Sequence, residues 1–516
     1  MTMSRRVLLP LAVPALLLAP LVAFFAGGAD LSSLAAAPYR RSFELGFLTA
    51  AGTLVLGLPA AWALAGSGCW SRWLRAAALA VMLVPPYLAA SAWLGICWRT
   101  GIVVKLAADS LALLPLESDV FMGGFNLLLC AAVMSLALWP CVALPAAASL
   151  ACLGREGREA AILARGRWAC LLRVELPAAL PAAVIGATLA FVMATAELGV
   201  PDLFEVNTAA RDVLKGFEGS HDYAMAAGRS LPLLALALVA AGGLLFAVRK
   251  RGMAALSRDR FLPLPAPLWA RCYATAVSFL ALGSILFGLA QNAGGTGAIA
   301  KAVSEEYGLV VRSLFLALLS AGAAVALCSA ALACVRGRRG WWVYAGVLGA
   351  LSLVLLLPGT AWGLGLLRLR VALGSLGAPG RALAWFLRSP MILVWAGAGR
   401  AALGAGIVLG WGRRRVNNEL LEAGRAAGLP AVRQWWLRAG LMRRHVAAAL
   451  LLGTALALGE LGAAVMIAPP GWETLPVRVF SAMHNYHGDV VAALALVTTA
   501  GVAILAALGA ALAVRR

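Results

Sequence analysis

The chain is poor in charge, and lysine is especially scarce. Charged residues make up 13% of the 516 positions, about half the share usual in a soluble domain. There are four lysines, and none of them follows a glycine: Lys105, Lys215, Lys250 and Lys301. A phosphate-binding P-loop needs Gly-Lys followed by Ser or Thr, to wrap the phosphates and hold Mg²⁺. The sequence therefore excludes ATP hydrolysis by this motif, and the chain is not expected to be an enzyme.

Metal-binding side chains are also few. The nine cysteines include no Cys-x-x-Cys pair, so we expect small buried hydrophobic side chains and neither a zinc site nor a disulfide framework. A His484-x-x-His487 pair close to Asp489 could bind a metal. The first half of the chain, however, has Ala224 where the second histidine would stand. The pattern favours a structural role for this element, and we expect no metal site and no cofactor.

Long apolar runs are what the sequence has in abundance. Hydrophobic residues make up 62% of the chain and the mean hydropathy is +0.89. A hydrocarbon core of about 30 Å takes about 20 apolar helical residues, and helices satisfy their own backbone groups in lipid. The fold class expected is all-α, a polytopic transmembrane bundle of about 12 helices. The expected spans are 7–29, 43–66, 73–98, 121–150, 179–200, 231–248, 270–291, 309–334, 341–367, 383–411, 446–468 and 491–514.

The excess of basic residues has a membrane explanation. The net charge is +21, which in a soluble protein would suggest nucleic acid. With a cytoplasmic N-terminus, most of the Lys and Arg fall on the cytoplasmic side, as the positive-inside rule requires. We expect a multi-pass protein of the bacterial inner (plasma) membrane with both termini cytoplasmic, lipid as its surroundings and no nucleic-acid partner. The first run resembles a signal sequence but is long for one, so we expect a retained helix, with cleavage near 26–29 as the alternative.

The two halves of the chain repeat one another. Five pairs of identical residues lie 263 positions apart: Glu159/Glu422, Glu197/Glu460, Phe217/Phe480, His221/His484 and Tyr223/Tyr486. Arg41-Ser42 likewise matches Arg312-Ser313 at a spacing of 271. We expect a first transmembrane repeat over 1–248, a basic, proline-punctuated cytoplasmic linker over 249–268 and a second repeat over 269–516. Six spans per repeat is an even number, so the repeats should be parallel.

Each half carries a charged segment that interrupts the apolar pattern on the expected cytoplasmic side. The segments are 154–177 and 412–444. Two glutamates one helical turn apart open each segment, and Gly166 or Gly428 then offers a helix stop. This pattern predicts a short helix–turn–helix at the membrane surface.

These segments resemble the EAA signature of the permease subunits of ABC-type importers, in which Glu-Ala-Ala and a spaced glycine precede a Leu-Pro. The first copy has Glu159-Ala160-Ala161, with Gly166 one residue later than the family spacing. The second has Glu422-Ala423-Gly424, with Gly428 at that spacing and Leu441-Met442 in place of Leu-Pro. The resemblance implies a fused two-copy permease, closest to the ferric-iron and thiamine type. It also implies two separate ATP-binding cassette ATPase subunits that receive these coupling helices, and a periplasmic or extracellular substrate-binding protein.

Two carboxylates fall inside the apolar pattern. Glu197-Leu198-Gly199 and Glu460-Leu461-Gly462 end matching spans near the expected outer face. Carboxylates at membrane depth are costly and often functional, so Glu197, Gly199, Glu460 and Gly462 are candidates for a gate or pathway. The alternative is that each glutamate caps a bend in the chain.

The transported substrate is not specified by the sequence. The outer loop of the second half leans towards ferric iron, with thiamine, an aminophosphonate and a polyamine as alternatives. An ion-coupled secondary transporter is the main competing function, although it should carry more ionisable residues at mid-membrane depth than this chain does. A membrane-embedded enzyme would need a catalytic cluster that the sequence does not contain.

Overall fold

The described residues form helices joined by short turns and contain no strand, which confirms the all-α prediction. The computed structural model describes residues 3–32, 34–97, 119–153, 155–251, 266–333, 335, 337–416, 418–484 and 488–514, and these contain no strand. Most of the expected linker, from 252 to 265, lies outside the described residues, as do Asn485, Tyr486 and His487.

The membrane spans expected from the sequence all fall on helices, but several of them are broken. Eight described helices are long and apolar enough to cross a bilayer, or up to eleven if each sharply bent pair is one span. The bends are 89° between α3 and α4, 104° between α17 and α18, and 80° between α22 and α23. The first expected span contributes the apolar helix Ala12–Ala26. The described residues therefore form a polytopic helical bundle.

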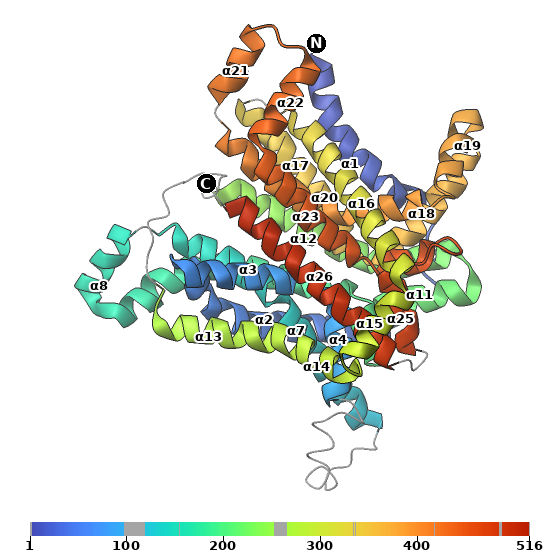
Figure 1. Cartoon of the computed structure of the whole chain (residues 1–516), viewed down its shortest axis with the longest axis horizontal. Helices are drawn as coiled ribbons and strands as arrows, with labels where there is room; N and C mark the ends of the chain where they lie inside the picture. Colours follow the sequence, from blue (N-terminus) through green and yellow to red (C-terminus); the bar gives the residue numbers. More distant parts are fainter. Residues whose placement is uncertain are drawn as a thin grey trace. The chain divides into compact units, whose positions relative to one another are not determined.

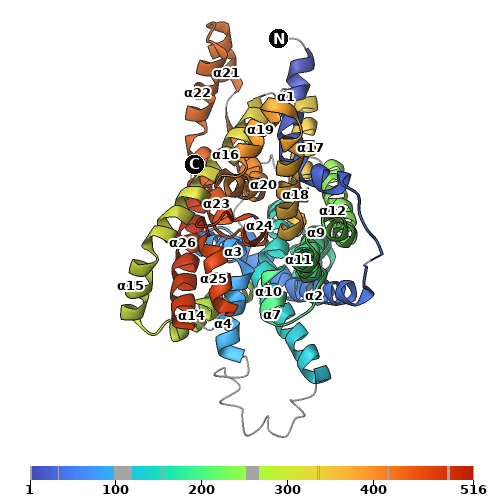
Figure 2. The ribbon, with the colours of Figure 1, turned by 90° about the vertical axis from the view of Figure 1, so that its right-hand side faces the viewer.

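The structure divides into two compact units, whose helices are labelled in Figures 1 and 2. The first comprises Met1–Ala29, Gly308–Val477 and Ile504–Arg516, and the second comprises Asp30–Tyr307 and Arg478–Ala503. The helices of the first are α1 (Met3–Ala26), α16 (Tyr307–Ala333), α17 (Gly337–Leu356), α18 (Gly359–Gly374), α19 (Gly377–Phe386), α20 (Met391–Arg415), α21 (Asn418–Ala426), α22 (Ala431–Leu441), α23 (Arg443–Leu458) and α24 (Gly462–Ile467). The boundaries between the units cross α25 (Leu475–His484) and α26 (Gly488–Val514).

The second unit contains most of the first half of the chain. Its helices are α2 (Ala36–Ala65), α3 (Cys69–Leu83), α4 (Pro86–Cys97), α7 (Asp119–Ala151), α8 (Arg155–Cys170), η1 (Leu171–Glu175), α9 (Leu176–Ala196), α10 (Gly199–Leu203), α11 (Ala209–Ser220), α12 (Tyr223–Arg251), α13 (Leu268–Ser278), η3 (Phe279–Gly283), α14 (Ser284–Asn292) and α15 (Thr296–Glu305). Its core gathers α2, α7 and α9 around the buried Trp139.

The boundaries of the compact units differ from those of the sequence repeats. They differ because the first helix of each half of the sequence packs against helices of the other half. Helix α1 lies against α17 and α18 (Figure 2), and its Val13 and Leu17 are part of the core of the first unit. Helix α13 lies against α2 and α3, and its Ala270 and Ala274 are part of the core of the second. The repeat boundaries themselves stay a prediction.

One detail of the repeat is visible in the hydrogen bonds. Ser42 Oγ accepts a hydrogen bond from the backbone N–H of Ala209, the first residue of α11, at 2.8 Å. Its sequence match, Ser313, accepts one from the backbone N–H of Leu475, the first residue of α25, also at 2.8 Å. The matched serines therefore hold the starts of α11 and α25, one helix in each half of the chain.

Small residues allow the helices of the second unit to pack with their backbones in contact. A Cβ atom added to Gly186 of α9 would lie 2.7 Å from Val142 Cα on α7 and would overlap the Cys141 carbonyl oxygen. Close backbone approach at glycine is a common way for membrane helices to associate.

We expect Gly186→Ala to lower the free energy of unfolding by about 1–3 kcal/mol, because the overlap is with backbone and cannot be relieved by a rotamer change. The matched control is Gly243→Ala on α12, where an added Cβ has nothing within 4 Å; it should be neutral or raise stability by about 0.5–1 kcal/mol. Thermal unfolding of the full chain in detergent measures both, and equal melting temperatures for the two variants would contradict the packing.

Candidate functional site

The first charged segment is a helix that turns back on itself at a glycine. Helix α8 starts at Arg155, and its backbone leaves helical geometry at Gly166, with φ +81° and ψ 170°. Nothing lies within 4 Å of a Cβ built there, so the glycine is needed for its positive φ rather than for space. Glu159 and Ala160 are exposed and Ala161 is half-buried. Glu159 and Ala160, called the tip of this segment below, are therefore exposed on the helix that precedes the turn.

A buried carboxylate ties this segment to the membrane bundle. Glu175, at the end of η1, is 4% exposed and forms an ion pair with Arg158 of α8. Its other oxygen accepts a hydrogen bond of 2.6 Å from the Trp62 indole N–H on α2. A buried carboxylate is stable only when its charge is paired and its lone pairs are satisfied, and here both conditions are met. The network fixes the exposed segment to α2, and a cavity of only about 30 Å³ remains beside it.

The sequence did not single out Glu175. It lies between apolar residues immediately before Leu176-Pro177, and an acid entering a membrane span was the one signal that could have marked it. Its partner Trp62 is 113 positions away, so the pairing could not be found from local spacing.

The second charged segment also combines an exposed Glu-Ala pair with a turn at a glycine of positive φ, but different residues lie behind it. Helices α21 and α22 are joined through Gly428, which has φ +70°, and Glu422 and Ala423 are exposed. Gly424 is buried because α22 approaches closely. An added Cβ would meet Leu437 Cδ2 at 3.1 Å and Leu429 Cδ1 at 3.2 Å. An alanine at the position of the signature's second alanine would therefore require these two leucine side chains to shift by a few tenths of an ångström.

The two residues that form the ion pair of the first segment are not repeated in the sequence of the second. The positions matching Arg158 and Glu175 at the repeat spacing of 263 are Leu421 and Arg438. Leu421 is 4% exposed, so an apolar side chain occupies the place of the arginine. The two segments therefore present similar exposed Glu-Ala pairs, but the residues of the buried Arg158–Glu175 pair are not repeated in the second segment.

Glu460 lies at a helix break and is buried. It falls between the end of α23 at Leu458 and the start of α24 at Gly462 and is 7% exposed. Its Oε1 accepts a hydrogen bond of 2.8 Å from the backbone N–H of Ala463, and its Oε2 lies 2.5 Å from Arg400 Nε on α20. A carboxylate at a helix N-terminus is favoured by the unpaired N–H groups there. The capping role considered from the sequence is therefore present, with a buried ion pair added to it.

Arg400 connects this break to a second one. Its guanidinium also donates to the carbonyl oxygen of Leu355 at 2.9 Å, close to the last residue of α17. A cation near a helix C-terminus satisfies exposed carbonyls and interacts favourably with the helix dipole. The broken helices also touch directly, since a Cβ on Gly462 would lie 2.9 Å from Gly359 Cα at the start of α18. One arginine and two glycines thus join two helix breaks.

The first half has the matching break without the matching arginine. Glu197 Oε1 accepts a hydrogen bond of 3.2 Å from the backbone N–H of the buried Gly199, where α10 begins. Helix α7 precedes the first charged segment as α20 precedes the second, and the sequence of α7 contains no basic residue. The structure therefore places all four gate candidates at paired helix breaks, and it makes the two breaks chemically different.

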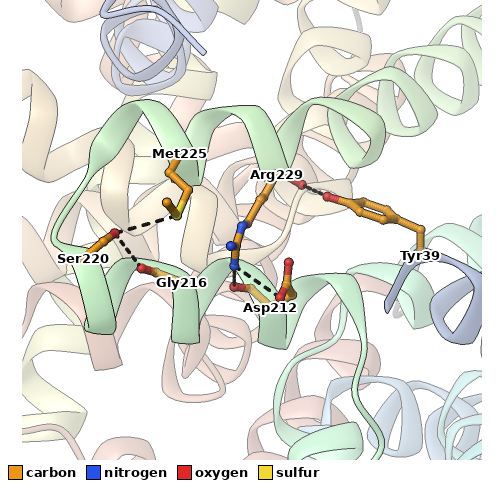
Figure 3. Close-up of polar contacts among 6 residues, drawn as sticks. All are labelled: Tyr39, Asp212, Gly216, Ser220, Met225 and Arg229. Carbon is orange, nitrogen blue, oxygen red and sulfur yellow. Dashed lines mark hydrogen bonds and ion pairs between the residues drawn. The ribbon is translucent and has the colours of Figure 1, made fainter. Parts of the chain in front are cut away.

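A polar cluster holds helices α11 and α12 together (Figure 3). Arg229 of α12 points towards Asp212 of α11 and donates to its backbone carbonyl at 3.1 Å and to its carboxylate at 3.2 Å. The Tyr39 hydroxyl donates to the Arg229 carbonyl oxygen at 2.6 Å. His221 adopts φ +55° at the end of α11, and its ring lies at a tilt beside that of Phe217, with the centroids 5.8 Å apart. The first His-x-Tyr element thus shapes a turn, and no group of three or more metal-binding side chains occurs within the described ranges.

The Arg400–Glu460 pair generates a stability prediction. Arg400→Gln should lower the free energy of unfolding by about 3–5 kcal/mol, because it leaves a buried carboxylate without its cation. The double variant Arg400→Met/Glu460→Gln should recover much of that loss, because no buried charge remains and a glutamine can still cap α24. The control Lys301→Gln breaks an exposed pair of 3.9 Å with Glu305 and should change stability by less than about 1 kcal/mol. Thermal unfolding of the full chain in detergent measures these changes. A melting temperature of Arg400→Gln equal to that of Lys301→Gln would contradict a stabilising role for the buried pair.

Comparison with known proteins gives short matches to transport permeases. No family model and no solved structure matches the chain. A stretch of 41 residues is 56% identical to a Salmonella paratyphi A protein assigned as the 2-aminoethylphosphonate transport system permease PhnV. The Salmonella typhi protein of that name is 66% identical over 32 residues. The matches span 8% and 6% of this chain and 16% and 12% of those relatives. They support a transport-permease family, and they are too short to transfer a relative's activity, substrate or partners to this chain.

Proposed function

We propose that this chain is the permease subunit of an ATP-driven importer, with two fused copies of the transmembrane unit in one polypeptide. The observation that carries the proposal is the duplicated surface element: two charged segments, each with an exposed Glu-Ala tip and a positive-φ glycine. A solvated loop has no need of the same tip in two copies, whereas a motor with two subunits needs two points of contact. The matches to transport permeases support the same function from an independent direction.

The two tips would transmit motion from the ATPase subunits. In this proposal Glu159 and Glu422 pair with basic residues of the two ATPases, while Ala160, Ala161, Ala423 and Gly424 allow a close approach. Gly166 and Gly428 supply the turns that return the chain to the membrane. The buried Glu175–Arg158 pair supports this role for the first segment, because it ties the tip rigidly to α2 and α9. A push on the tip would then move spanning helices rather than bend a loop.

The helix breaks at Glu197-Leu198-Gly199 and Glu460-Leu461-Gly462 are the proposed gate elements. Non-helical backbone at membrane depth is tolerated where protein buries it or where it lines a cavity, and broken helices commonly form the binding sites of transporters. A small cavity of about 30 Å³ within the first unit is lined by Glu460 together with Ser313, Ser320 and Thr474. Substrate would reach these elements from a binding protein on the outer face.

For the substrate we propose a small aminophosphonate. The ferric iron favoured from the sequence, and the thiamine and polyamine alternatives, gain no support from the comparisons. The aminophosphonate alternative does, since the matched relatives are named for 2-aminoethylphosphonate. The cytoplasmic placement of both termini and of both charged segments remains part of the proposal.

An ion-coupled secondary transporter is the second candidate, and the buried Arg400–Glu460 pair favours it to some degree. Ionisable side chains at membrane depth are the usual means of ion coupling. The two candidates differ in their need for nucleotide, so uptake in vesicles without ATP but with an ion gradient would favour the secondary transporter.

A double charge reversal tests the coupling role. Glu159→Lys/Glu422→Lys should leave the ATPase subunits hydrolysing ATP while uptake falls at least tenfold, because the exposed tips no longer pair with the motor. The control is Glu218→Lys, at an exposed acid on α11 far along the chain from either segment; it should leave uptake unchanged.

Reconstituted proteoliposomes containing the ATPase and binding protein give both rates. Undiminished uptake in the double variant would contradict the coupling role. Loss of uptake in the Glu218→Lys control would show that a change of surface charge alone lowers uptake.

A further inference from the structure

We propose that the first unit binds an anionic phospholipid in a groove between α16, α22 and α23, with the phosphate on Arg438 and an acyl chain along α16. The groove has a volume of about 260 Å³. Along α16 its wall is made of Gly322, Val325, Ala326 and Ser329, and Arg438 and Trp436 line it from α22. This site is separate from the helix breaks and from the exposed tips, and it does not depend on the proposed transport activity.

The hollow arises from small side chains on one face of α16. Gly322, Ala326 and Ser329 are spaced four and three residues apart, so they lie on the same face of the helix. A Cβ added to Gly322 would have nothing within 4 Å, so space is open in front of it. From Gly322 to Leu332 the helix rises roughly 15 Å, about half the thickness of a hydrocarbon core. The groove therefore has the length of one bilayer leaflet.

The same face of α16 continues beyond the groove as an exposed apolar stripe. Val311, Phe315 and Leu318 are exposed large hydrophobic side chains in register with Gly322. In a helix apolar enough to span a bilayer, such a stripe is what acyl chains contact. An acyl chain lying on the stripe would continue into the hollow without leaving its apolar surroundings.

The other end of the groove is basic, and this charge favours a lipid with an anionic headgroup. The segment 412–444 contains eight arginines and two glutamates, and one of those arginines, Arg438, lines the groove itself. Trp436 beside it is largely exposed, as tryptophans at the headgroup level of membranes often are. Basic pockets between membrane helices bind anionic headgroups. Arg438 occupies the position where the first half has Glu175, so the site belongs to the second copy alone.

Native mass spectrometry of the full chain in detergent tests the proposal, with equal amounts of phosphatidylglycerol and phosphatidylethanolamine carrying identical acyl chains. We expect the wild type to retain phosphatidylglycerol about fivefold more strongly, because one basic residue near an anionic headgroup has an effect of that size. Arg438→Gln should remove the preference and Arg438→Lys should keep it. Gly322→Leu should lower the retention of both lipids, because its side chain fills the hollow.

Two matched variants separate the groove from general effects. Arg433→Gln removes an exposed arginine from the same helix, and Gly346→Leu adds the same side chain at an exposed glycine of α17 with nothing within 4 Å. Both should bind lipid as the wild type does. No preference in the wild type, an equal loss in Arg433→Gln, or full retention in Gly322→Leu would each overturn the proposal.

Discussion

A helix that ends inside the protein leaves backbone carbonyl and amide groups without water, and the helix breaks of the first unit meet this constraint with paired side chains. Arg400 satisfies the carbonyl end of α17, and Glu460 caps the start of α24. The ion pair between Arg400 and Glu460 connects these two helix ends. An unpaired charge is costly in such a buried site, so each of the two side chains is stabilised by the other. The close contact of Gly359 with Gly462 follows from the same arrangement.

The duplicated elements keep their outward form while their supports differ. Each charged segment carries an exposed Glu-Ala pair and then turns at a glycine with positive φ. Behind the first tip lies a buried network of Arg158, Glu175 and Trp62. Behind the second, the matching positions hold Leu421 and Arg438. The difference recurs at the helix breaks, where only the second copy has an arginine from the preceding long helix. In the proposed function, both tips contact the same kind of ATPase subunit, so the tips are alike. The residues behind the tips make no contact with the ATPase and can differ between the two copies.

Much of this architecture could be predicted from the sequence, because its signals are local. The apolar runs predicted the spanning helices, and Gly166 and Gly428 indicated the turns. The bends were less accessible, although Pro85, Pro86 and Pro358 stand at two of them. What the sequence could not supply were partners far apart in the chain. Trp62 and Glu175 are 113 residues apart, and Arg400 and Glu460 are 60. The packing of α1 with α18 joins the start of the chain to its second half.

Gly424 is an instructive intermediate case. From the sequence it is a departure from the Glu-Ala-Ala signature, whereas in the structure it is the residue that admits Leu429 and Leu437. A departure from a motif can therefore mark a packing constraint that the motif's other members meet in another way. The second His-x-Tyr element remains a prediction, because 485–487 lie outside the described residues.

The central claim is that the two halves are parallel copies whose charged tips reach the same side of the membrane. Its most direct test is a protease site inserted at Gly157 in one variant and at Ala427 in another, with cleavage measured in right-side-out and inverted vesicles. The account predicts that both sites are cut in inverted vesicles and protected in right-side-out ones. Cleavage of the two sites from opposite sides of the membrane would contradict it.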